Sequence, residues 1–115
     1  VGRRGVAGNF FVIKAVGAAS EKGASLEELA ALGRRVNSVT RTMGIALSSC
    51  TPPSKETTLF QIAGDEMEVG IGIHGEPGRK RTKVVSADEI VDILLEAVVT
   101  DLPYQSGDKV ALMIN

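Results

Sequence analysis

The feature that most constrains the fold is a run of strict alternation at residues 66–74. Apolar side chains occupy every second position of this run, at Met67, Val69, Ile71 and Ile73. The positions between them are Glu68, Gly70, Gly72 and His74. Because successive side chains of a strand point to opposite faces, the pattern predicts a strand over 66–73 with one apolar face. Its other face would be almost bare backbone, which indicates that something approaches it closely.

Two interpretations of the bare face are open. Side chains at Gly70 or Gly72 would fill the space that a small polar substrate needs, so the glycines could contribute to its binding by absence. Close packing of a helix on the same face would explain them equally well.

A turn follows the alternating run, at Gly75-Glu76-Pro77-Gly78. It leaves His74, the single histidine of the chain, at the end of the expected strand. The imidazole could cap the turn by hydrogen bonding, or its neutral form could act as a nucleophile. Glu76 could orient the other ring nitrogen or be an ordinary turn carboxylate, and Gly75 would fix the direction of the imidazole.

The remaining sequence predicts helices and short strands around this segment. A helix over 6–22 is apolar on most sides and is expected to be buried. Ser25 and Ser86 each have a glutamate three residues on, which predicts capping boxes that open a second helix, ending near residue 42, and a third before Pro103. Further strands are expected over 44–50 and 109–114, and the basic run 79–83 is expected to be an exposed connection.

The predicted order is therefore α-α-β-β-α-β. This order indicates one α/β domain over 1–115, with a mixed sheet flanked by helices.

Composition excludes several classes of function. The formal net charge is −1 at pH 7, and the aromatic residues are three phenylalanines and one tyrosine, so nucleic-acid binding has little support. No apolar run reaches the roughly 20 residues of a membrane-spanning helix. The lone Cys50 favours a cytoplasmic setting and is expected to be a buried, inert thiol before Pro52-Pro53. One histidine and one cysteine do not build a tetrahedral metal site.

Two other patterns have plain explanations. Residues 70–75 match a dinucleotide fingerprint formally, but they precede a turn and a basic loop rather than a helix. The basic clusters Arg3-Arg4 and Arg79-Lys80-Arg81 are explained by solvated surface, or alternatively by docking of a partner subunit.

Residues 68–78 resemble the signature around the substrate-binding histidine of dihydroxyacetone kinases. The likeness extends over nearly the whole chain in the family's order, at 2–8, 14–21, 25–28, 43–51 and 105–115. Two departures occur, at 9–11 and at 52–60, and both bear on loop geometry near the site. The resemblance implies a fragment of the dihydroxyacetone-binding subunit, itself a larger α/β unit.

The same resemblance implies a phosphotransferase that makes dihydroxyacetone phosphate. His74 would hold the ketone as a covalent hemiaminal, with Gly70, Gly72, Gly75 and Glu76 around the substrate. ATP with magnesium, or a phosphorylated carrier protein, would be supplied by a nucleotide-binding partner domain or subunit, and related subunits are commonly homodimers.

The family's second histidine and catalytic aspartate belong to Gly-Gly-Gly-Ser-Gly-His-Glu-Pro and Asn-Tyr-Thr-Gly-Asp segments that this sequence does not contain. The fragment alone is therefore expected to be inactive. An alternative within the resemblance is a non-catalytic relative that binds the ketone and acts as coactivator of a transcription regulator.

Overall fold

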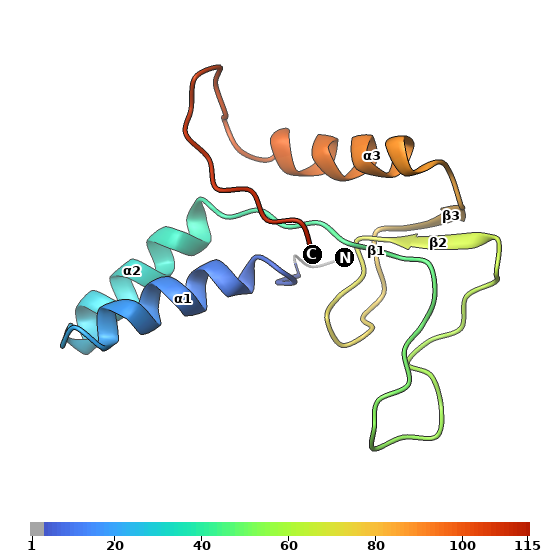
Figure 1. Ribbon diagram of the computed structural model, residues 1–115, viewed down its shortest axis with the longest axis horizontal. Helices are drawn as coiled ribbons and strands as arrows, with labels where there is room; N and C mark the ends of the chain where they lie inside the picture. The colour runs from blue at the N-terminus through green and yellow to red at the C-terminus, as the bar shows by residue number, and fades with distance from the viewer. Residues whose placement is uncertain (1–3) are drawn as a thin grey trace.

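A computed structural model describes residues 4–115 and places helices around one small sheet (Figure 1). Within that range the elements, in order along the chain, are α1 (Asn9–Ser20), α2 (Leu26–Ser38), β1 (Ile45–Ala46), β2 (Glu66–Val69), β3 (Lys80–Lys83) and α3 (Ala87–Val99). The combination of helices and a sheet confirms the predicted fold class.

The sheet has the order β1-β2-β3, and both pairings are antiparallel. The central strand β2 carries the core, since Met67 is fully buried and Val69 is 6% exposed. Opposite charges face each other across β2 and β3, where Glu66 pairs with Lys83 and Glu68 with Arg81. Such cross-strand pairs stabilise a sheet and help to set its register.

Both predicted capping boxes are present. The Ser25 side chain accepts a hydrogen bond from the Glu28 amide at 3.3 Å, and the Glu28 carboxylate accepts one from the Ser25 amide at 2.8 Å. Ser86 and Glu89 make the same reciprocal contacts at the start of α3. These bonds satisfy amides that would otherwise lack partners at a helix start.

Helix α1 packs against α2 but has no buried residue. Phe10 is 51% exposed and Ile13 is 69% exposed. The expectation of a helix buried on most sides is therefore wrong for this structure, because a single neighbouring helix covers only one side of it.

Two segments differ from the sequence prediction. The basic run expected to be a connection forms β3, because its backbone pairs with β2 while its charged side chains remain at the edge of the sheet. The expected strand over 109–114 does not form, and its apolar residues are exposed: Val110, Leu112 and Ile114. A strand needs backbone pairing with a neighbouring strand, and within the described residues the segment 109–114 belongs to no sheet.

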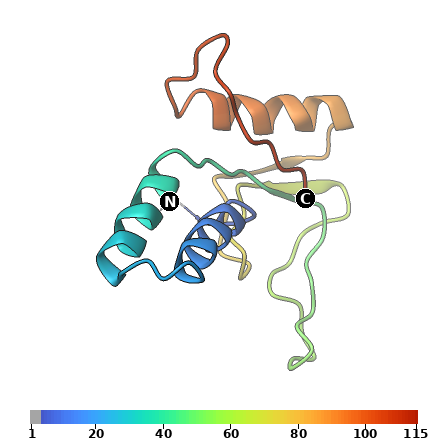
Figure 2. The ribbon, with the colours of Figure 1, turned by 60° about the vertical axis from the view of Figure 1, so that its left-hand side comes forward.

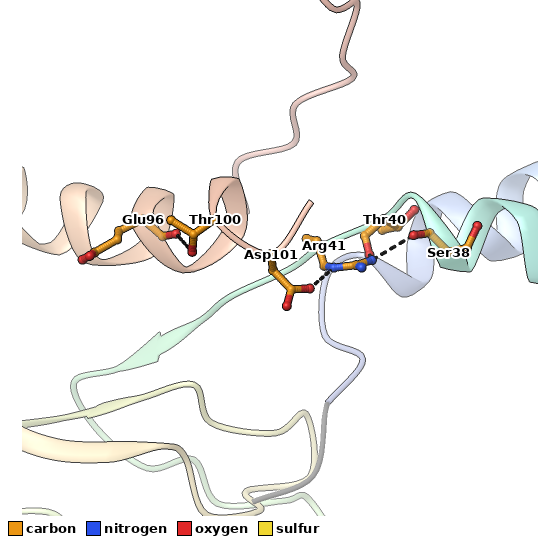
Figure 3. A network of polar contacts seen from close by, with 6 residues as sticks. All are labelled: Ser38, Thr40, Arg41, Glu96, Thr100 and Asp101. Carbon is orange, nitrogen blue, oxygen red and sulfur yellow. Dashed lines mark hydrogen bonds and ion pairs between the residues drawn. The ribbon is translucent and has the colours of Figure 1, made fainter. Parts of the chain in front are cut away.

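Figures 1 and 2 show α3 on one side of the sheet, with the long connection from β1 to β2 extending away on the other. Arg41, in the segment between α2 and β1, forms an ion pair with Asp101, which follows α3 (Figure 3). Its guanidinium also donates to the carbonyl oxygens of Ser38 at 3.0 Å and Thr40 at 2.9 Å. No helix in residues 4–115 combines the length and apolarity needed to span a bilayer.

Candidate functional site

Strand β2 ends at Val69, earlier than the sequence predicted. Gly70 has a φ of +80°, a left-handed conformation that favours glycine, and its amide donates to the Gly44 carbonyl at 2.7 Å. The chain therefore leaves the plane of the sheet, and the alternation stops with it. Ile73, expected on the apolar face, is 58% exposed.

Residues 70–79 form a loop whose far end returns to β2; we call this the His74 loop. The Arg79 amide donates to the Val69 carbonyl at 2.7 Å, and the Gly78 amide donates to the Glu68 carboxylate at 2.8 Å. The loop thus leaves from β2 and is hydrogen-bonded to the same strand at its far end, before the chain continues into β3.

A tight turn shapes the tip of the His74 loop. The Gly75 amide donates to the Gly72 carbonyl at 3.0 Å, and the Gly72 amide donates to the Glu76 carbonyl at 3.0 Å. Gly75 has a φ of +81°, and a Cβ there would lie 2.9 Å from the Cβ of Leu59. Gly75 is thus required by the turn, as predicted, and Leu59 supports it from the β1–β2 connection, a contact that the sequence did not reveal.

His74 lies at the tip, and its side chain is 83% exposed. Its Nδ1 is 3.1 Å from Oε1 of Glu76, and its backbone amide donates to Oε2 of Glu76 at 2.9 Å. The predicted contact between Glu76 and the second ring nitrogen is therefore present. This leaves Nε2 directed away from the carboxylate.

The electrostatics of Glu76 define the tautomer of the ring. The backbone amides of Glu76 and His74, together with the His74 ring, lower the pKa of Glu76 to about 2. An ionised carboxylate only accepts hydrogen bonds, so Nδ1 must carry the hydrogen in this contact. In the neutral ring, Nε2 then has a free lone pair.

The two glycines of the expected bare face have side-chain neighbours. A Cβ at Gly72 would lie 2.1 Å from Oε2 of Glu76, and one at Gly70 would lie 3.2 Å from both Cγ of Arg79 and Cε of Met43. Loop side chains, rather than a packed helix, therefore explain these glycines in this structure. Their contact with a substrate stays a prediction.

Glu68 is a site residue that the sequence did not reveal. It is 7% exposed, and its Oε2 accepts a hydrogen bond from Nε of Arg81 at 2.8 Å. This bond lowers the pKa of Glu68, burial opposes the change, and the Gly78 amide adds to the lowering. The signal available in the sequence was a carboxylate two residues before a glycine, on a strand that pairs with the basic run.

Other predictions concern chemistry away from the loop. Cys50 is exposed rather than buried, because β1 ends at Ala46 and leaves Cys50 in the long connection. The glycines of 70–75 lead to β3 and not to a helix, as the sequence predicted, so they lack the helix start that a phosphate loop uses. Residues 4–115 hold no group of three metal-ligating side chains.

A cavity of about 640 Å³ borders both ends of the His74 loop, at Gly70, Ile71 and Arg79. Arg4 and Arg41 also line it, whereas His74 does not. In the part of the chain that the structure describes, the imidazole therefore faces solvent and not this cavity.

Comparison with known proteins identifies the family. The model of the Dak1 domain matches residues 1–115. The chain belongs to the Dak1 family. The Dak1 chain is 47% identical over 114 residues to the dihydroxyacetone-binding subunit DhaK of a PTS-dependent dihydroxyacetone kinase from Listeria innocua, covering 99% of this chain and 35% of that protein.

More distant Dak1 relatives come from bacteria and animals. The DhaK subunit of the PEP-dependent dihydroxyacetone kinase of Escherichia coli is 38% identical over 138 residues, covering 99% of this chain and 39% of the relative. Human triokinase/FMN cyclase is 41% identical over 122 residues, covering 99% of this chain and 20% of the relative. The chain thus spans two fifths or less of these relatives.

Solved structures agree with the Dak1 assignment. A dihydroxyacetone kinase from C. freundii in complex with AMP-PNP and Mg²⁺ superposes with a TM-score of 0.74 at 30% identity, covering 86% of this chain and 18% of that one. The dihydroxyacetone kinase operon co-activator DhaQ superposes with a TM-score of 0.66 at 33% identity, covering 84% of this chain and 31% of that one.

Proposed function

We propose that residues 1–115 are a single-domain fragment of the dihydroxyacetone-binding subunit of a dihydroxyacetone kinase. In this subunit His74 captures the ketone. The contact between ionised Glu76 and Nδ1 of His74, at 3.1 Å, carries the proposal. This contact orients the ring and leaves Nε2 as an exposed nucleophile. The ring lies at the tip of a loop whose turn is made by glycines.

The capture is a reversible addition. The Nε2 lone pair forms a bond to the carbonyl carbon of dihydroxyacetone, while the electron pair of the C=O bond moves to oxygen. The oxygen takes a proton from water and the cationic ring returns the Nδ1 proton to water, so the net charge is unchanged. Glu76 stabilises the transient positive charge of the ring, because an ionised carboxylate lies beside Nδ1.

The product is a hemiaminal, which cannot proceed to an imine because the ring nitrogen has no second hydrogen to lose. A site of this kind selects carbonyl compounds over plain polyols such as glycerol, which offer no electrophilic carbon. Gly70, Gly72, Gly75 and Glu76 would shape the surroundings of the bound ketone.

Phosphoryl transfer then requires groups outside the fragment. A base must take the proton of the reacting hydroxyl, and cations must clamp the phosphoryl group. By the resemblance, the family's second histidine and catalytic aspartate belong to segments that this sequence does not contain, and its glycine loop does not fit a nucleoside triphosphate, so the fragment alone should be inactive. The donor, ATP with magnesium or a phosphorylated carrier protein, would come from a nucleotide-binding partner domain or subunit. A cytoplasmic homodimer is the expected setting.

The decisive experiment is a crystal structure of the full-length protein soaked with dihydroxyacetone. Continuous density between Nε2 of His74 and the central carbon of the ligand is expected. A ligand separated from the ring by van der Waals distances would refute covalent capture.

Binding measurements test the same proposal in solution. In the full-length protein His74→Ala should abolish the preference for dihydroxyacetone over glycerol, because the remaining contacts involve hydroxyl groups common to both. The control is Lys14→Ala, an exposed side chain on α1, which should leave the preference unchanged. Retained selectivity in His74→Ala would contradict the proposal.

A second candidate function is a ketone-binding coactivator of a transcription regulator. The similarity to DhaQ, with a TM-score of 0.66, favours it specifically. A full-length sequence would separate the two, because loss of the aspartate of the Asn-Tyr-Thr-Gly-Asp segment would leave binding without phosphoryl transfer.

A further inference from the structure

Glu68 lies under the base of the His74 loop, on the strand from which the loop departs. We propose that Glu68 is a positioning residue, which clamps the far end of the His74 loop and thereby sets the position of His74 for ketone capture. This inference rests on the proposed function. It assigns a purpose to a buried carboxylate that takes no part in the capture itself.

The clamp joins three points of the chain. Oε1 of Glu68 accepts the Gly78 amide at 2.8 Å, where the loop returns, and Oε2 accepts Nε of Arg81 at 2.8 Å, on β3. Glu68 and Arg81 are also register partners across β2 and β3. One side chain therefore fixes both the return of the loop and the strand that follows it.

Gly78 is shaped for this contact. A Cβ at position 78 would lie 2.3 Å from the Val69 carbonyl oxygen and 3.0 Å from Oε1 of Glu68. The first of these atoms belongs to the backbone and has little freedom to move. Only glycine allows the returning chain to come close enough for its amide to reach the carboxylate.

The partners of Glu68 explain why a charged side chain can be buried at this position. Burying a charge is unfavourable unless it is paired and hydrogen-bonded, and Glu68 has both kinds of partner. Without the carboxylate, the Gly78 amide would lose its acceptor in a buried setting, which costs more than the bond itself contributes. The loop end would then separate from β2 and carry the tip with it.

A second ion pair, between the residue just before β2 and the last residue of β3, provides a matched control. Asp65 and Lys83 pair at the opposite end of the hairpin from the His74 loop, with side chains 68% and 69% exposed. This pair links the start of β2 to the end of β3, and it does not touch the loop. It separates an effect on the sheet from an effect on His74.

The test compares affinities for dihydroxyacetone and glycerol in the full-length protein, by calorimetry or by inhibition. Glu68→Gln should weaken dihydroxyacetone binding about tenfold, because glutamine has a single acceptor oxygen and cannot accept from both the Gly78 amide and the Arg81 guanidinium. Glycerol affinity should be unchanged, because glycerol is not captured by His74. Asp65→Asn should leave both affinities unchanged.

Several outcomes would overturn the inference. Equal losses for both ligands in Glu68→Gln would leave the ratio of affinities unchanged and would mean a purely structural role, and unchanged affinities for both would mean no role in positioning. If Glu68→Gln fails to fold, Arg81→Gln opens the clamp from its half-exposed side. That variant should lower the dihydroxyacetone affinity about threefold, and an unchanged ratio there would equally overturn the inference.

His74→Ala distinguishes failure of the proposed function from failure of the inference about Glu68. If it keeps the preference for the ketone, the proposed function fails, and positioning of His74 by Glu68 fails with it. If His74→Ala loses the preference and both clamp variants keep it, only the inference about Glu68 fails.

Discussion

Replacing Gly72 with alanine would test the geometry of the site most directly. The added Cβ would lie 2.1 Å from Oε2 of Glu76, where ordinary van der Waals contact begins at 3.4 Å. The carboxylate must therefore retreat by about 1.3 Å. A side-chain end can move that far, whereas the Cβ of Glu76, 2.9 Å from the added atom, requires a small shift of the turn as well. Gly72 is not among the positive-φ glycines, so its own backbone conformation permits alanine.

The retreat breaks the contacts that hold the carboxylate. The bond from the His74 amide to Oε2 is 2.9 Å long, and a further 1.3 Å or so places it outside the range of a hydrogen bond. The contact with Nδ1, at 3.1 Å, fails in the same movement. We therefore expect the pKa of Glu76 to rise from about 2 toward its ordinary value of 4.5.

The assay is a titration of the Glu76 side-chain carboxyl by carbon NMR in the full-length protein, alongside dihydroxyacetone binding. Gly64→Ala is the control, because a Cβ at that exposed position meets nothing within 4 Å. A Gly72→Ala protein with a Glu76 pKa still near 2 would refute the reasoning. So would normal ketone binding combined with the raised pKa, because Glu76 would then not be needed to orient His74.

The same pKa predicts a pH dependence with a definite sign. The folded-state pKa of Glu76 is lowered, so its contribution to the loop is complete above about pH 4.5 and is lost as pH falls toward 2. Amide exchange at His74, compared with that of Glu76→Gln, should show this loss in the wild type alone.

Three further predictions concern the fold of the full-length protein. Met67→Ala should lower the free energy of unfolding by about 2–5 kcal/mol in denaturant titrations, because a fully buried side chain leaves a cavity; a loss below about 1 kcal/mol would contradict the core assignment. Ser86→Ala should cost about 1 kcal/mol through the lost cap of α3, and an unchanged midpoint would contradict it. Arg41→Gln should increase amide exchange at the end of α3, because it removes the ion pair to Asp101; unchanged exchange would mean that the pair does not hold this helix.

Local signals in the sequence located most of the elements. The serine–glutamate spacing of the capping boxes fixed the starts of α2 and α3, because those contacts lie within one turn. The alternation placed β2 correctly but extended it too far, because the exit at Gly70 depends on a bond to the distant Gly44 carbonyl. Strand 109–114 was predicted from its pattern, yet a pattern cannot supply the edge with which a strand must pair.

The sequence by itself determined the family, the loop that carries His74, and the proximity of Glu76, since these two residues are neighbours in one turn. Only the tertiary structure decided that β3 pairs with β2, that Glu68 is buried, and that Leu59 packs against Gly75. The physical reason is the range of the interactions. Caps and turns are made within a few residues, whereas burial and strand pairing depend on which distant segment happens to lie alongside.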